Sequence, residues 1–493
     1  MKRHQLLAMT KTCLLAVAGM LMASCADTYD GKDSFQYDVR NTVLASPSEA
    51  DITITPSTDG SHMDIEWPVV FGAGGYQFKL LNASDETKPL VNDTIIDGCK
   101  LTVSREEDMN YKIVLRTIGN TKLNNSDAPT ATEKLYSTFA ASFATIPDGS
   151  DLYQYFQENP LPDAGNDGDT EEEGEETVSE FIFDLVPGGN YTVSQPVNFD
   201  YKKVILRTAD KTNHAAITLD AGANFIASND LTLNYVDIDA SATEKPLVEA
   251  YNYSENPDGI LEKPGNYYLI NFVRIMNSNV TGLVGSLFYD NNKSWCVVNF
   301  LIKNCVILLN TKTDAIKNQA LISFQGGGAK DFSISNSTVY QGGEGNSNYF
   351  IRYNNSARVD RFGWTTADHT TMTYTNNTFY KVASSQWGNY SGISNYSTYD
   401  ARYNIWYDCA DGNIARRMMG NGRLGNNASA NWVSNTYWNS TTGQVDQGTY
   451  DASGTALTTD PAFVDAANGI LTPTGAEQVE NKTGDPRWYA VSE

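Results

Sequence analysis

The chain has 493 residues, more than one hydrophobic core usually organises, so we expect two or three domains. It carries 35 Lys and Arg against 59 Asp and Glu, a formal net charge of −24. A protein that binds nucleic acid needs a positively charged surface, so nucleic-acid binding is excluded. Thr, Ser, Asn, Gly, Tyr, Val and Ile are frequent and helical periodicity is hard to find, which favours strands and turns.

Residues 1–24 predict a lipoprotein signal peptide. Basic residues precede an apolar run at 13–22, CLLAVAGMLM, which is too short to span a bilayer. The run ends in LMASC and resembles a bacterial lipoprotein lipobox, which implies that Cys25 is lipidated and becomes the new N-terminus. It departs from the family pattern because Leu21 lies four residues before the cysteine and Met22 takes the usual leucine position. The alternative is an ordinary signal peptide, with Cys25 there by chance.

Residues 25–45 are polar without a period and predict a tether. Asp27, Asp30 and Asp33 closely follow the cysteine, and they resemble the export signal that sends such lipoproteins to the outer face of the outer membrane. Loss of the signal peptide would leave 32 basic against 59 acidic side chains. We therefore expect a lipid-anchored protein of the outer membrane, exposed at the cell surface and strongly acidic.

Residues 46–146 predict a β-sandwich. Short runs of alternating polar and apolar residues, among them HMDIEWP and NYKIVLRTI, are separated by turn residues at intervals typical of that fold. Trp67 on an early run and Tyr111 on a later one stand where fibronectin type III domains carry a core Trp and a strand-F Tyr, so the segment resembles that family. Both side chains are expected in the core and not at a binding site.

Residues 147–180 predict an acidic linker. Nine acidic side chains fall within 160–180, where apolar residues are almost absent. Such a run repels itself and stays solvated. The letters NDGD within it are similar to part of a calcium loop, but the remaining ligands of that motif are missing at the required spacing.

The cysteines predict no disulfide framework. Of the six, one would leave with the signal peptide and one would carry the lipid. The other four are Cys99, Cys296, Cys305 and Cys409. They form no CxxC pair and no metal-binding spacing, so buried free thiols are expected. An oxidising envelope would permit a disulfide among them, and that alternative stays open.

From residue 181 to residue 493 the sequence repeats itself. An Asn next to a short β-branched or aromatic run recurs at spacings between 27 and 41 residues. The aligned positions are Asn234, Asn271, Asn304, Asn336, Asn376 or Asn377, Asn404 and Asn435. Because the units hold short strands and no amphipathic helix, they predict stacked parallel coils, with Asn ladders at the bends and Val, Ile, Phe and Tyr on the inner face.

This repeated region, 181–493, resembles the pectate-lyase-like right-handed parallel β-helices. The closing stretches DPAFVDAANGILTPTG, at 460–475, and GDPRW, at 484–488, are similar to the final coil and cap of such chains. The layout of lipobox, fibronectin-like module and β-helix resembles surface lipoproteins of Bacteroidota polysaccharide-utilisation systems. The resemblance implies an all-β fold, with a β-sandwich followed by a β-helix, and identifies no reaction.

A binding site is expected in the window 350–425, because long insertions fall there and β-helices of this class hold an extended polysaccharide along one groove. The window contains eight basic against five acidic residues, and 14 aromatic residues among 76. Aromatic faces stack on sugar rings and Arg holds carboxylates, which suits an acidic glycan. The predicted binding residues are Arg352, Arg361, Trp364, His369, Trp387, Tyr390 and Arg423. The alternatives are core packing for the aromatic residues and a solvated or ion-paired role for the charged ones.

Six further residues of the window are candidates for catalysis. β-Elimination on a uronide needs a base and a cation on the adjacent carboxylate. The related lyases use Lys or Arg with calcium, which implies Lys381, Arg416 or Arg417 as the base. The calcium ligands would be Asp368, Asp408 or Asp411. Hydrolysis by the related polygalacturonases needs paired carboxylates, and their NTD, DD and GHG signatures are absent, which disfavours a hydrolase.

Three functions remain open from the sequence. The first is binding of an extended, acidic, pectin-like polysaccharide by a lipid-anchored surface protein. The second is an active polysaccharide lyase that cleaves uronides by β-elimination, with calcium as the candidate cofactor. The third is a structural surface protein without glycan activity. The expected partners are a polysaccharide and the outer membrane, with no nucleic acid, and the oligomeric state stays open.

Overall fold

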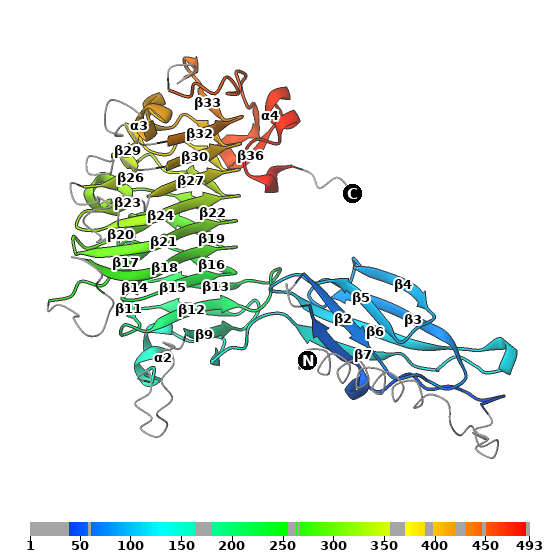
Figure 1. Cartoon of the computed structure of the whole chain (residues 1–493). Coiled ribbons are helices and arrows are strands. Elements are labelled where there is room, and N and C mark those ends of the chain that lie inside the picture. Colours follow the sequence, from blue (N-terminus) through cyan, green and yellow to red (C-terminus); the bar gives the residue numbers. More distant parts are fainter. Residues whose placement is uncertain are drawn as a thin grey trace, which may run out of the picture. The chain divides into compact units, whose positions relative to one another are not determined.

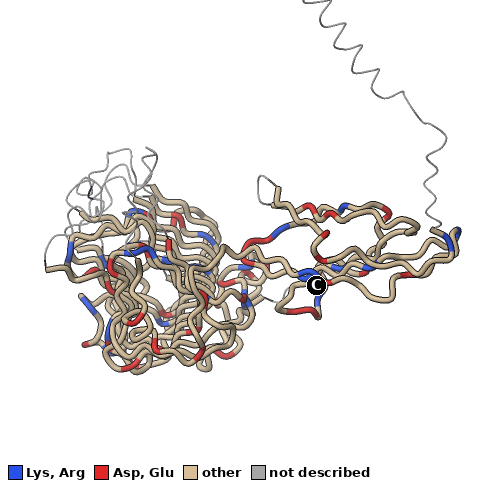
Figure 2. The backbone as a smooth tube through the Cα atoms, turned by 90° about the horizontal axis from the view of Figure 1, so that it is seen from below, with Lys and Arg blue, Asp and Glu red and all other residues tan. Residues whose placement is uncertain are grey.

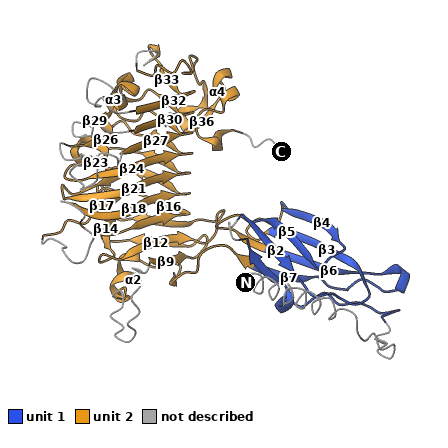
Figure 3. Ribbon diagram, in the orientation of Figure 1, with its two compact units in different colours: residues 1–81, 88–105, 112–135 blue, residues 82–87, 106–111, 136–493 orange. Residues whose placement is uncertain are grey.

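The computed structural model describes most of the chain, and its secondary structure is mostly β. It covers residues 39–57, 61–162, 180–254, 263, 267–354, 370–389, 398–419, 429–445 and 450–489. The chain divides into two compact units, and the larger one is built from residue 136 onward together with 82–87 and 106–111 (Figure 3). Among the described residues, no helix is long and apolar enough to cross a membrane.

The N-terminal strands form two antiparallel sheets, with the orders β1-β2-β5 and β4-β3-β6-β7. Their bounds are Thr53–Pro56 (β1), His62–Glu66 (β2), Ala73–Asn82 (β3), Val91–Ile96 (β4), Lys100–Ser104 (β5), Asn110–Gly119 (β6) and Thr132–Ser137 (β7). The sheets meet where the Trp67 ring contacts Tyr76 and Phe78, with centroids 5.5 and 6.0 Å apart. Trp67 and Tyr111 are 5% and 1% exposed, so the prediction that both lie in the core is confirmed.

The described end of the expected tether is part of this packed structure. Val43 pairs with Ser126 in an isolated bridge, and Leu44 is buried. Leu44 leaves water because burial of its apolar side chain stabilises the fold. Two 3-10 helices lie in the connections, at Glu49–Asp51 (η1) and Thr121–Leu123 (η2). The signal peptide and Cys25 lie outside the described residues.

The larger unit takes up part of the range 147–180, which the sequence assigned to a linker. Just before it, β8 (Ala144–Ile146) pairs in parallel with the next strand of the chain. Helix α2 (Leu152–Glu158) lies inside the range. Leu152 and Phe156 are four residues apart on one face of this helix, and both are buried in the core of the larger unit. The linker is therefore shorter than expected at its N-terminal end.

From β9 onward the chain winds through three sheets in turn (Figure 1). The first sheet contains β8, β9 (Glu180–Leu185), β12 (Lys203–Thr208), β15 (Leu231–Asn234), β18 (Tyr268–Met276), β21 (Trp295–Lys303), β24 (Gly328–Ser335), β27 (Thr371–Thr375), β30 (Thr398–Arg402) and β32 (Ser429–Val433). The second contains β10 (Asn190–Val193), β13 (Ala215–Leu219), β16 (Val236–Asp239), β19 (Asn279–Leu283), β22 (Val306–Leu309), β25 (Thr338–Gln341), β28 (Thr378–Tyr380), β31 (Ile405–Tyr407), β33 (Thr436–Asn439) and β34 (Gly443–Gln444). The third contains β11 (Val197–Asn198), β14 (Phe225–Ala227), β17 (Val248–Ala250), β20 (Phe288–Tyr289), β23 (Ala320–Phe324), β26 (Tyr349–Tyr353) and β29 (Gln386–Asn389).

Strands of the same sheet stack in register from coil to coil. In most coils a strand pairs in parallel with the strand three places later, as β12 does with β15 and β13 with β16. The last pair of the second sheet, β33 and β34, is antiparallel instead. These long parallel sheets fit the parallel β-helix that the repeats predict.

The interior of the coils is apolar and increasingly aromatic. Along each strand inward side chains alternate with outward ones, as in β27, where Met372 and Tyr374 are fully buried. Further along, the rings of Phe350 and Trp387 stack with centroids 4.3 Å apart. The predicted filling of the inner face by Val, Ile, Phe and Tyr is confirmed by one continuous core.

A left-handed residue forms the bend from the first sheet to the second. The φ angle lies between 47° and 56° at Tyr235, Asn277, Asn304, Asn336, Asn376, Tyr403 and Ser434. After Gly, Asn is among the residues that adopt this conformation most readily, because its short side chain hydrogen-bonds locally. This preference accounts for part of the Asn repeat.

The residue after this bend forms a buried ladder. Asn377, Asn404 and Asn435 are fully buried, and each side-chain oxygen accepts a hydrogen bond from the ladder residue of the coil before it. The accepted N–H groups are those of Ser337 (3.1 Å), Asn377 (3.1 Å) and Asn404 (3.0 Å). The predicted Asn ladder is therefore confirmed, and it satisfies backbone groups that the bend leaves without a strand partner.

The sequence alignment mixed two positions of the bend. Asn304 and Asn336 are left-handed residues, whereas Asn404 and Asn435 occupy the ladder position that follows. Asn271 is not at a bend at all, because it lies inside β18, and Asn277 takes the left-handed position of that coil. Both positions favour Asn, the first for its left-handed backbone conformation and the second for its side-chain amide. The amino-acid sequence alone therefore does not distinguish the two positions.

Residues 459–489, which we call the cover segment, lie over the outer face of the second sheet. They contain β35 (Phe463–Asp465), η6 (Ala466–Asn468), β36 (Ile470–Pro473), α4 (Ala476–Asn481) and η7 (Pro486–Trp488). The Phe463 ring is 6.1 Å from that of Tyr380 and 5.4 Å from that of Tyr407, both on the second sheet. Figure 1 shows α4 and β36 beside the coils. The expectation that this segment caps the end of the stack is thus corrected.

The outward residues of the second sheet explain this position. One outward row is polar in the early coils, with Thr192, Thr218 and Asp239 in register. In the later coils the row becomes apolar, and its members are Leu308, Tyr340, Tyr380, Tyr407 and Trp438. Removal of this apolar row from water stabilises the fold, and the cover segment makes apolar contacts with part of the row.

Candidate functional site

Six predicted site residues lie outside the described residues, so the structure says nothing about them. They are Arg361, Trp364, Asp368, His369, Tyr390 and Arg423. The structure describes the other predicted glycan-binding, catalytic and calcium-binding residues, which are Arg352, Lys381, Trp387, Asp408, Asp411, Arg416 and Arg417. They divide among the core, the outer face of the third sheet, and the bend and short helix that follow the second sheet.

Trp387 lies in the core, so its prediction as a sugar-stacking residue is wrong. It is 0% exposed, stacks on Phe350 and meets the Phe379 ring edge-on at 4.7 Å. The strand β29 pairs in register with β26, which places Trp387 beside the inward Phe350 of the previous coil. The surrounding Gly, Ser and Asn suggested a loop, whereas they flank a short strand.

Trp387→Phe is expected to lower the free energy of unfolding by about 1 kcal/mol, because a smaller ring leaves a void against Phe350. Retention of the folded variant in polysaccharide gels should equal that of the wild type. Urea denaturation followed by circular dichroism measures the first effect, and affinity electrophoresis measures the second. A variant of unchanged stability with weaker retention would instead place Trp387 at the glycan.

Arg352 lies on β26 and is held by its neighbours. Its Nη1 donates to the Asn318 carbonyl oxygen at 3.0 Å, and its guanidinium carbon lies 5.4 Å from the centre of the Tyr349 ring. Asn318 belongs to the 3-10 helix η3 (Lys317–Gln319). These contacts account for Arg352 without a ligand, and its binding role stays a prediction.

Lys381 and Asp408 occupy the same place in adjacent coils, at the bend from the second sheet toward the third. Both are left-handed, with φ of 56° and 51°, and the strands before them pair in register. The Asp408 carboxylate accepts a hydrogen bond from Ser440 N at 2.7 Å, so it supports the next turn of the chain. Asp411 follows in the 3-10 helix η5 (Ala410–Gly412). In the described part of the chain, no three His, Cys, Asp or Glu side chains form a group that could hold a metal ion.

Arg416 and Arg417 lie on helix α3 (Ala415–Met419), which packs against β29. Arg416 Nη1 is 3.5 Å from Asn413 Oδ1, and its Cζ is 6.0 Å from the centre of the Tyr450 ring. Within the described ranges, no ion pair joins Arg416 to Asp408 or Asp411. Among the described residues, Arg416 therefore lies in the same region as Asp408 and Asp411 without an ion pair to either, and the lyase chemistry stays a prediction.

A polar hollow of about 290 Å³ opens where the first sheet bends into the second. It is lined by His214, Tyr235, Asn277, Asn279, Asn304, Lys211 and Arg487, and we call it the amide hollow. Sequence reasoning missed all seven as site residues. The only signals were the repeated Asn, which we assigned to the scaffold, and the arginine of GDPRW, which we assigned to a cap.

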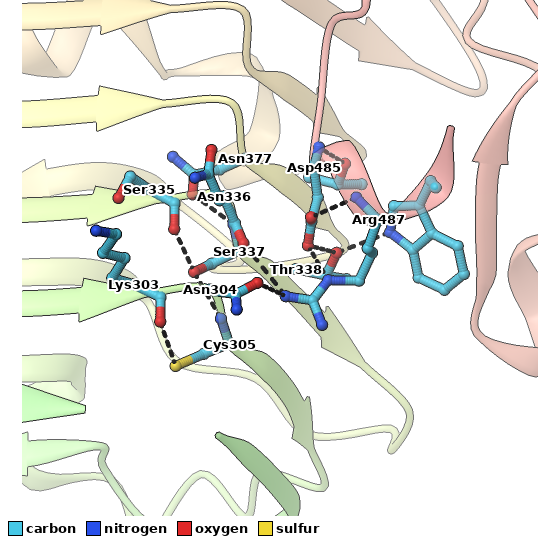
Figure 4. A network of polar contacts seen from close by, with 12 residues as sticks. Lys303, Asn304, Cys305, Ser335, Asn336, Ser337, Thr338, Asn377, Asp485 and Arg487 are labelled. Atoms are coloured by element: carbon cyan, nitrogen blue, oxygen red, sulfur yellow. Dashed lines mark hydrogen bonds and ion pairs between the residues drawn. The ribbon is translucent and has the colours of Figure 1, made fainter. Parts of the chain in front are cut away.

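A row of side-chain amides crosses the hollow along the coil axis. Asn277 Nδ2 donates to Asn234 Oδ1 at 2.8 Å, and Asn304 Nδ2 donates to Asn277 Oδ1 at 2.9 Å. Arg487 Nη2 then donates to Asn304 Oδ1 at 3.1 Å (Figure 4). The row forms because two of these residues sit at the left-handed bend of successive coils, where their side chains stack.

Beside this row, His214 and Asn279 share one carboxylate. His214 Nδ1 is 3.1 Å from Asp237 Oδ1, and Asn279 Nδ2 donates to the same oxygen at 2.7 Å. Burial acts to raise the pKa of Asp237, but the hydrogen bonds from His214 and Asn279 outweigh it and lower the pKa below its usual value. Asp237 therefore stays ionised and is already engaged by two donors.

Arg487 enters the hollow from the cover segment and is held there by Asp485. The Asp485 side chain is buried, and its Oδ2 accepts from Arg487 Nε at 2.5 Å and from Thr338 Oγ1 at 2.7 Å (Figure 4). Burial raises the pKa of Asp485, and the Arg487 charge opposes that rise. Trp488 Nε1 also donates to Thr338 Oγ1, at 2.8 Å, which fixes the turn that presents Arg487.

The amide hollow can bind a polar ligand by hydrogen bonds and charge. The amide, guanidinium and ammonium groups of its lining provide N–H donors in several directions. Along the described coils, basic and acidic residues lie interspersed, so the site is not part of a large basic patch (Figure 2). Recognition would therefore rest on local geometry and not on a long-range field.

Comparison with known families divides the chain into three domains in tandem. Residues 1–188 match DUF4992, residues 189–342 match DUF4957 and residues 332–488 match DUF5123, each described as a domain of unknown function. No curated protein and no solved structure matches the chain. The first boundary falls between β9 and β10, inside the first coils, so the family limits do not coincide with the two compact units.

Proposed function

We propose that this chain is a cell-surface lipoprotein of Bacteroidota that binds an extended, acidic, pectin-like polysaccharide on a right-handed parallel β-helix. Lipidation at Cys25 would anchor it in the outer membrane. The N-terminal sheets would act as a fibronectin type III-like spacer. The proposal combines the lipobox-like segment with stacked parallel coils, and the glycan site is the part that the geometry supports best.

The observation that carries the proposal is the amide row that runs from Asn234 through Asn277 and Asn304 to Arg487. Neighbouring parallel strands lie about 4.8 Å apart, so a row of this kind repeats a donor at each coil. A polysaccharide repeats hydroxyl and carboxylate acceptors along its length. A linear polymer can therefore make several equivalent contacts where a compact ligand makes few.

The spacer assignment is supported by the order of the N-terminal strands. The orders β1-β2-β5 and β4-β3-β6-β7 divide seven strands between two antiparallel sheets, as sandwiches of the immunoglobulin-like architecture do. The Tyr111 hydroxyl accepts a hydrogen bond from Glu106 N at 2.7 Å, five residues upstream, which is similar to the tyrosine corner of such domains.

We favour binding over β-elimination because the placed catalytic candidates make structural contacts. Asp408 supports the turn at Ser440, and Arg416 contacts Asn413. A lyase needs its base and its calcium ligands to converge on one sugar residue. Unsaturated product, measured by ultraviolet absorbance after incubation with uronides and calcium, would establish the lyase in place of a binding protein.

Mature protein is expected to migrate more slowly in native gels that contain polygalacturonate, rhamnogalacturonan or a glycosaminoglycan than in gels without polymer, because bound polymer holds it back. A gel with a neutral polysaccharide is the control for sieving. Retardation in at least one acidic gel, and none in the neutral gel, is the expected result. Equal migration in all of them would refute glycan binding and leave the structural role.

A further inference from the structure

We propose that the amide hollow is the subsite for one sugar residue that bears an oxyanion, a carboxylate or a sulfate, and that Arg487 with the amides of Asn304 and Asn277 binds this group. The inference rests on the proposed function and deepens it, because it names the chemical group that the polymer presents. It also makes the cover segment a part of the binding site.

Arg487 is fixed with one nitrogen unused. Its Nε is bound to Asp485, and its Nη2 donates to Asn304 Oδ1 at 3.1 Å and to the Asn336 carbonyl oxygen at 3.3 Å. Among the described residues, Nη1 has no hydrogen-bond partner, and a guanidinium nitrogen of this kind carries two N–H donors. The guanidinium is therefore oriented before any ligand arrives, which reduces the entropy lost on binding.

The amide row keeps hydrogen-bonding groups for a ligand beside the Arg487 guanidinium. Each Asn side chain has two N–H groups, and Asn277 and Asn304 each use one of them on the neighbouring amide. Their oxygens already accept, from Asn304 Nδ2 and from Arg487 Nη2 respectively. Each of the two amides therefore keeps one N–H and one oxygen lone pair, and Arg487 Nη1 adds two N–H donors and a positive charge. A carboxylate or sulfate accepts from these N–H groups and is attracted by the guanidinium charge, so it forms stronger hydrogen bonds here than a hydroxyl does.

Each carboxylate at the hollow is already engaged by a donor or a cation. The described carboxylates here are engaged as follows: Asp485 with Arg487, Asp237 with His214 and Asn279, Asp108 with the Tyr235 hydroxyl, and Glu106 with Lys211, whose Nζ is 3.8 Å away. Each acidic side chain thus faces a donor or a cation, while unused N–H groups remain on Arg487 and the amide row. An oxyanion at the hollow gains charge-assisted hydrogen bonds of the strong class.

The hollow has room for one sugar residue of a polymer. About 290 Å³ lies near the lower end of the volumes seen for small-molecule sites, which run from roughly 300 to 1,000 Å³. One sugar ring fits a space of that size. The neighbouring units of a polymer would therefore extend outside the hollow.

Three sugars that differ at one carbon test the inference: D-galactose, D-galacturonate and D-galactose 6-sulfate. Ligand-observed NMR titration of the mature protein gives a dissociation constant for each. Both charged sugars, or one of them, should bind at least about tenfold more tightly than galactose. Tighter binding of galacturonate assigns a uronate polymer, and tighter binding of the sulfate assigns a sulfated one.

Arg487→Gln should weaken binding of the charged sugar at least about tenfold, and Arg487→Lys should weaken it less, because Lys keeps the charge and loses the planar fork. Arg402→Gln is the matched control, since Arg402 pairs with Asp400 at 2.6 Å on β30, outside the hollow. Thermal unfolding checks that each variant keeps its fold. Asp485→Asn provides a second route, because it should weaken binding by releasing Arg487 without removing it.

Two outcomes overturn the inference. In the first, galactose binds as tightly as the charged sugars, or none of the three binds. In the second, Arg487→Gln binds the charged sugar as the wild type does. Native gels separate these failures from a failure of the proposed function: protein that is retarded by polygalacturonate but does not depend on Arg487 is a glycan-binding protein with its site elsewhere.

Discussion

Asn404→Ala is expected to lower the free energy of unfolding of the larger unit by about 3 kcal/mol. The Asn404 amide oxygen accepts from Asn377 N and Nδ2, and its Nδ2 donates to the Tyr374 carbonyl oxygen at 2.9 Å and to Asn435 Oδ1 at 3.0 Å. The substitution leaves a buried N–H and a buried C=O without partners, and each such group costs roughly 1–3 kcal/mol. Urea denaturation followed by near-ultraviolet circular dichroism reports the loss.

Asn376→Ser is the control for this change, because Asn376 is the adjacent left-handed residue and is not part of the buried ladder. Ser already occupies the same position in a later coil, at Ser434. The control should therefore cost less than about 1 kcal/mol. Equal effects of the two substitutions would contradict the role of the ladder.

Asp290→Ala is expected to lower the free energy of unfolding by more than Asn404→Ala does, by about 4 kcal/mol. The reason is that Asp290 accepts hydrogen bonds from four backbone N–H groups in a fully buried position. Its Oδ2 accepts from residues 325, 326 and 327 at 2.7–2.9 Å, and its Oδ1 accepts from Asn292 N at 3.0 Å. These donors turn the chain from β23 of the third sheet toward β24 of the first. Alanine leaves all four unsatisfied.

The pH dependence of Asp290→Asn separates charge from shape. Burial raises the pKa of Asp290 to about 6, against the effect of the backbone donors, whereas an unfolded Asp titrates near 3.8. Between these values the native state binds more protons than the unfolded state, so this group stabilises the fold at low pH and loses that contribution as the pH rises through 6. The side-chain amide of Asn does not titrate, so the Asp290→Asn variant lacks this contribution to the pH dependence. The stability of the wild type relative to Asp290→Asn should fall between about pH 4 and pH 7, and a constant difference would contradict the buried titration.

The architecture of the larger unit could be predicted from the sequence because it depends on a pattern that recurs. Inward apolar residues such as Phe379 return in each coil and Asn ladder residues such as Asn377 return in the later coils, and repetition makes both visible. The exact register could not be predicted, because Asn serves two adjacent positions of the bend for different reasons. Helix α2 was also missed, since only Leu152 and Phe156 mark its buried face.

The candidate site could not be predicted, because its residues are joined only by the fold. Arg487 and Asn304 are 183 positions apart in the chain, and their contact depends on where the cover segment lies. Aromatic content was a poor guide in the window 350–425. Trp387 belongs to a strand of four residues, which is too short to show its alternation of inward and outward side chains.

The cover segment also sets the order in which the molecule can be completed. Residues 459–489 are made after the coils that they cover, yet they bond to Thr338 and Thr378, which lie more than a hundred residues earlier. Until then the row that includes Tyr340 and Tyr407 faces water, and each coil is joined only to its neighbours. A chain cut short before residue 459 would keep its coils and leave this row of aromatic side chains exposed to water. Docking of the cover segment thus closes a linear stack into a structure whose coils unfold together.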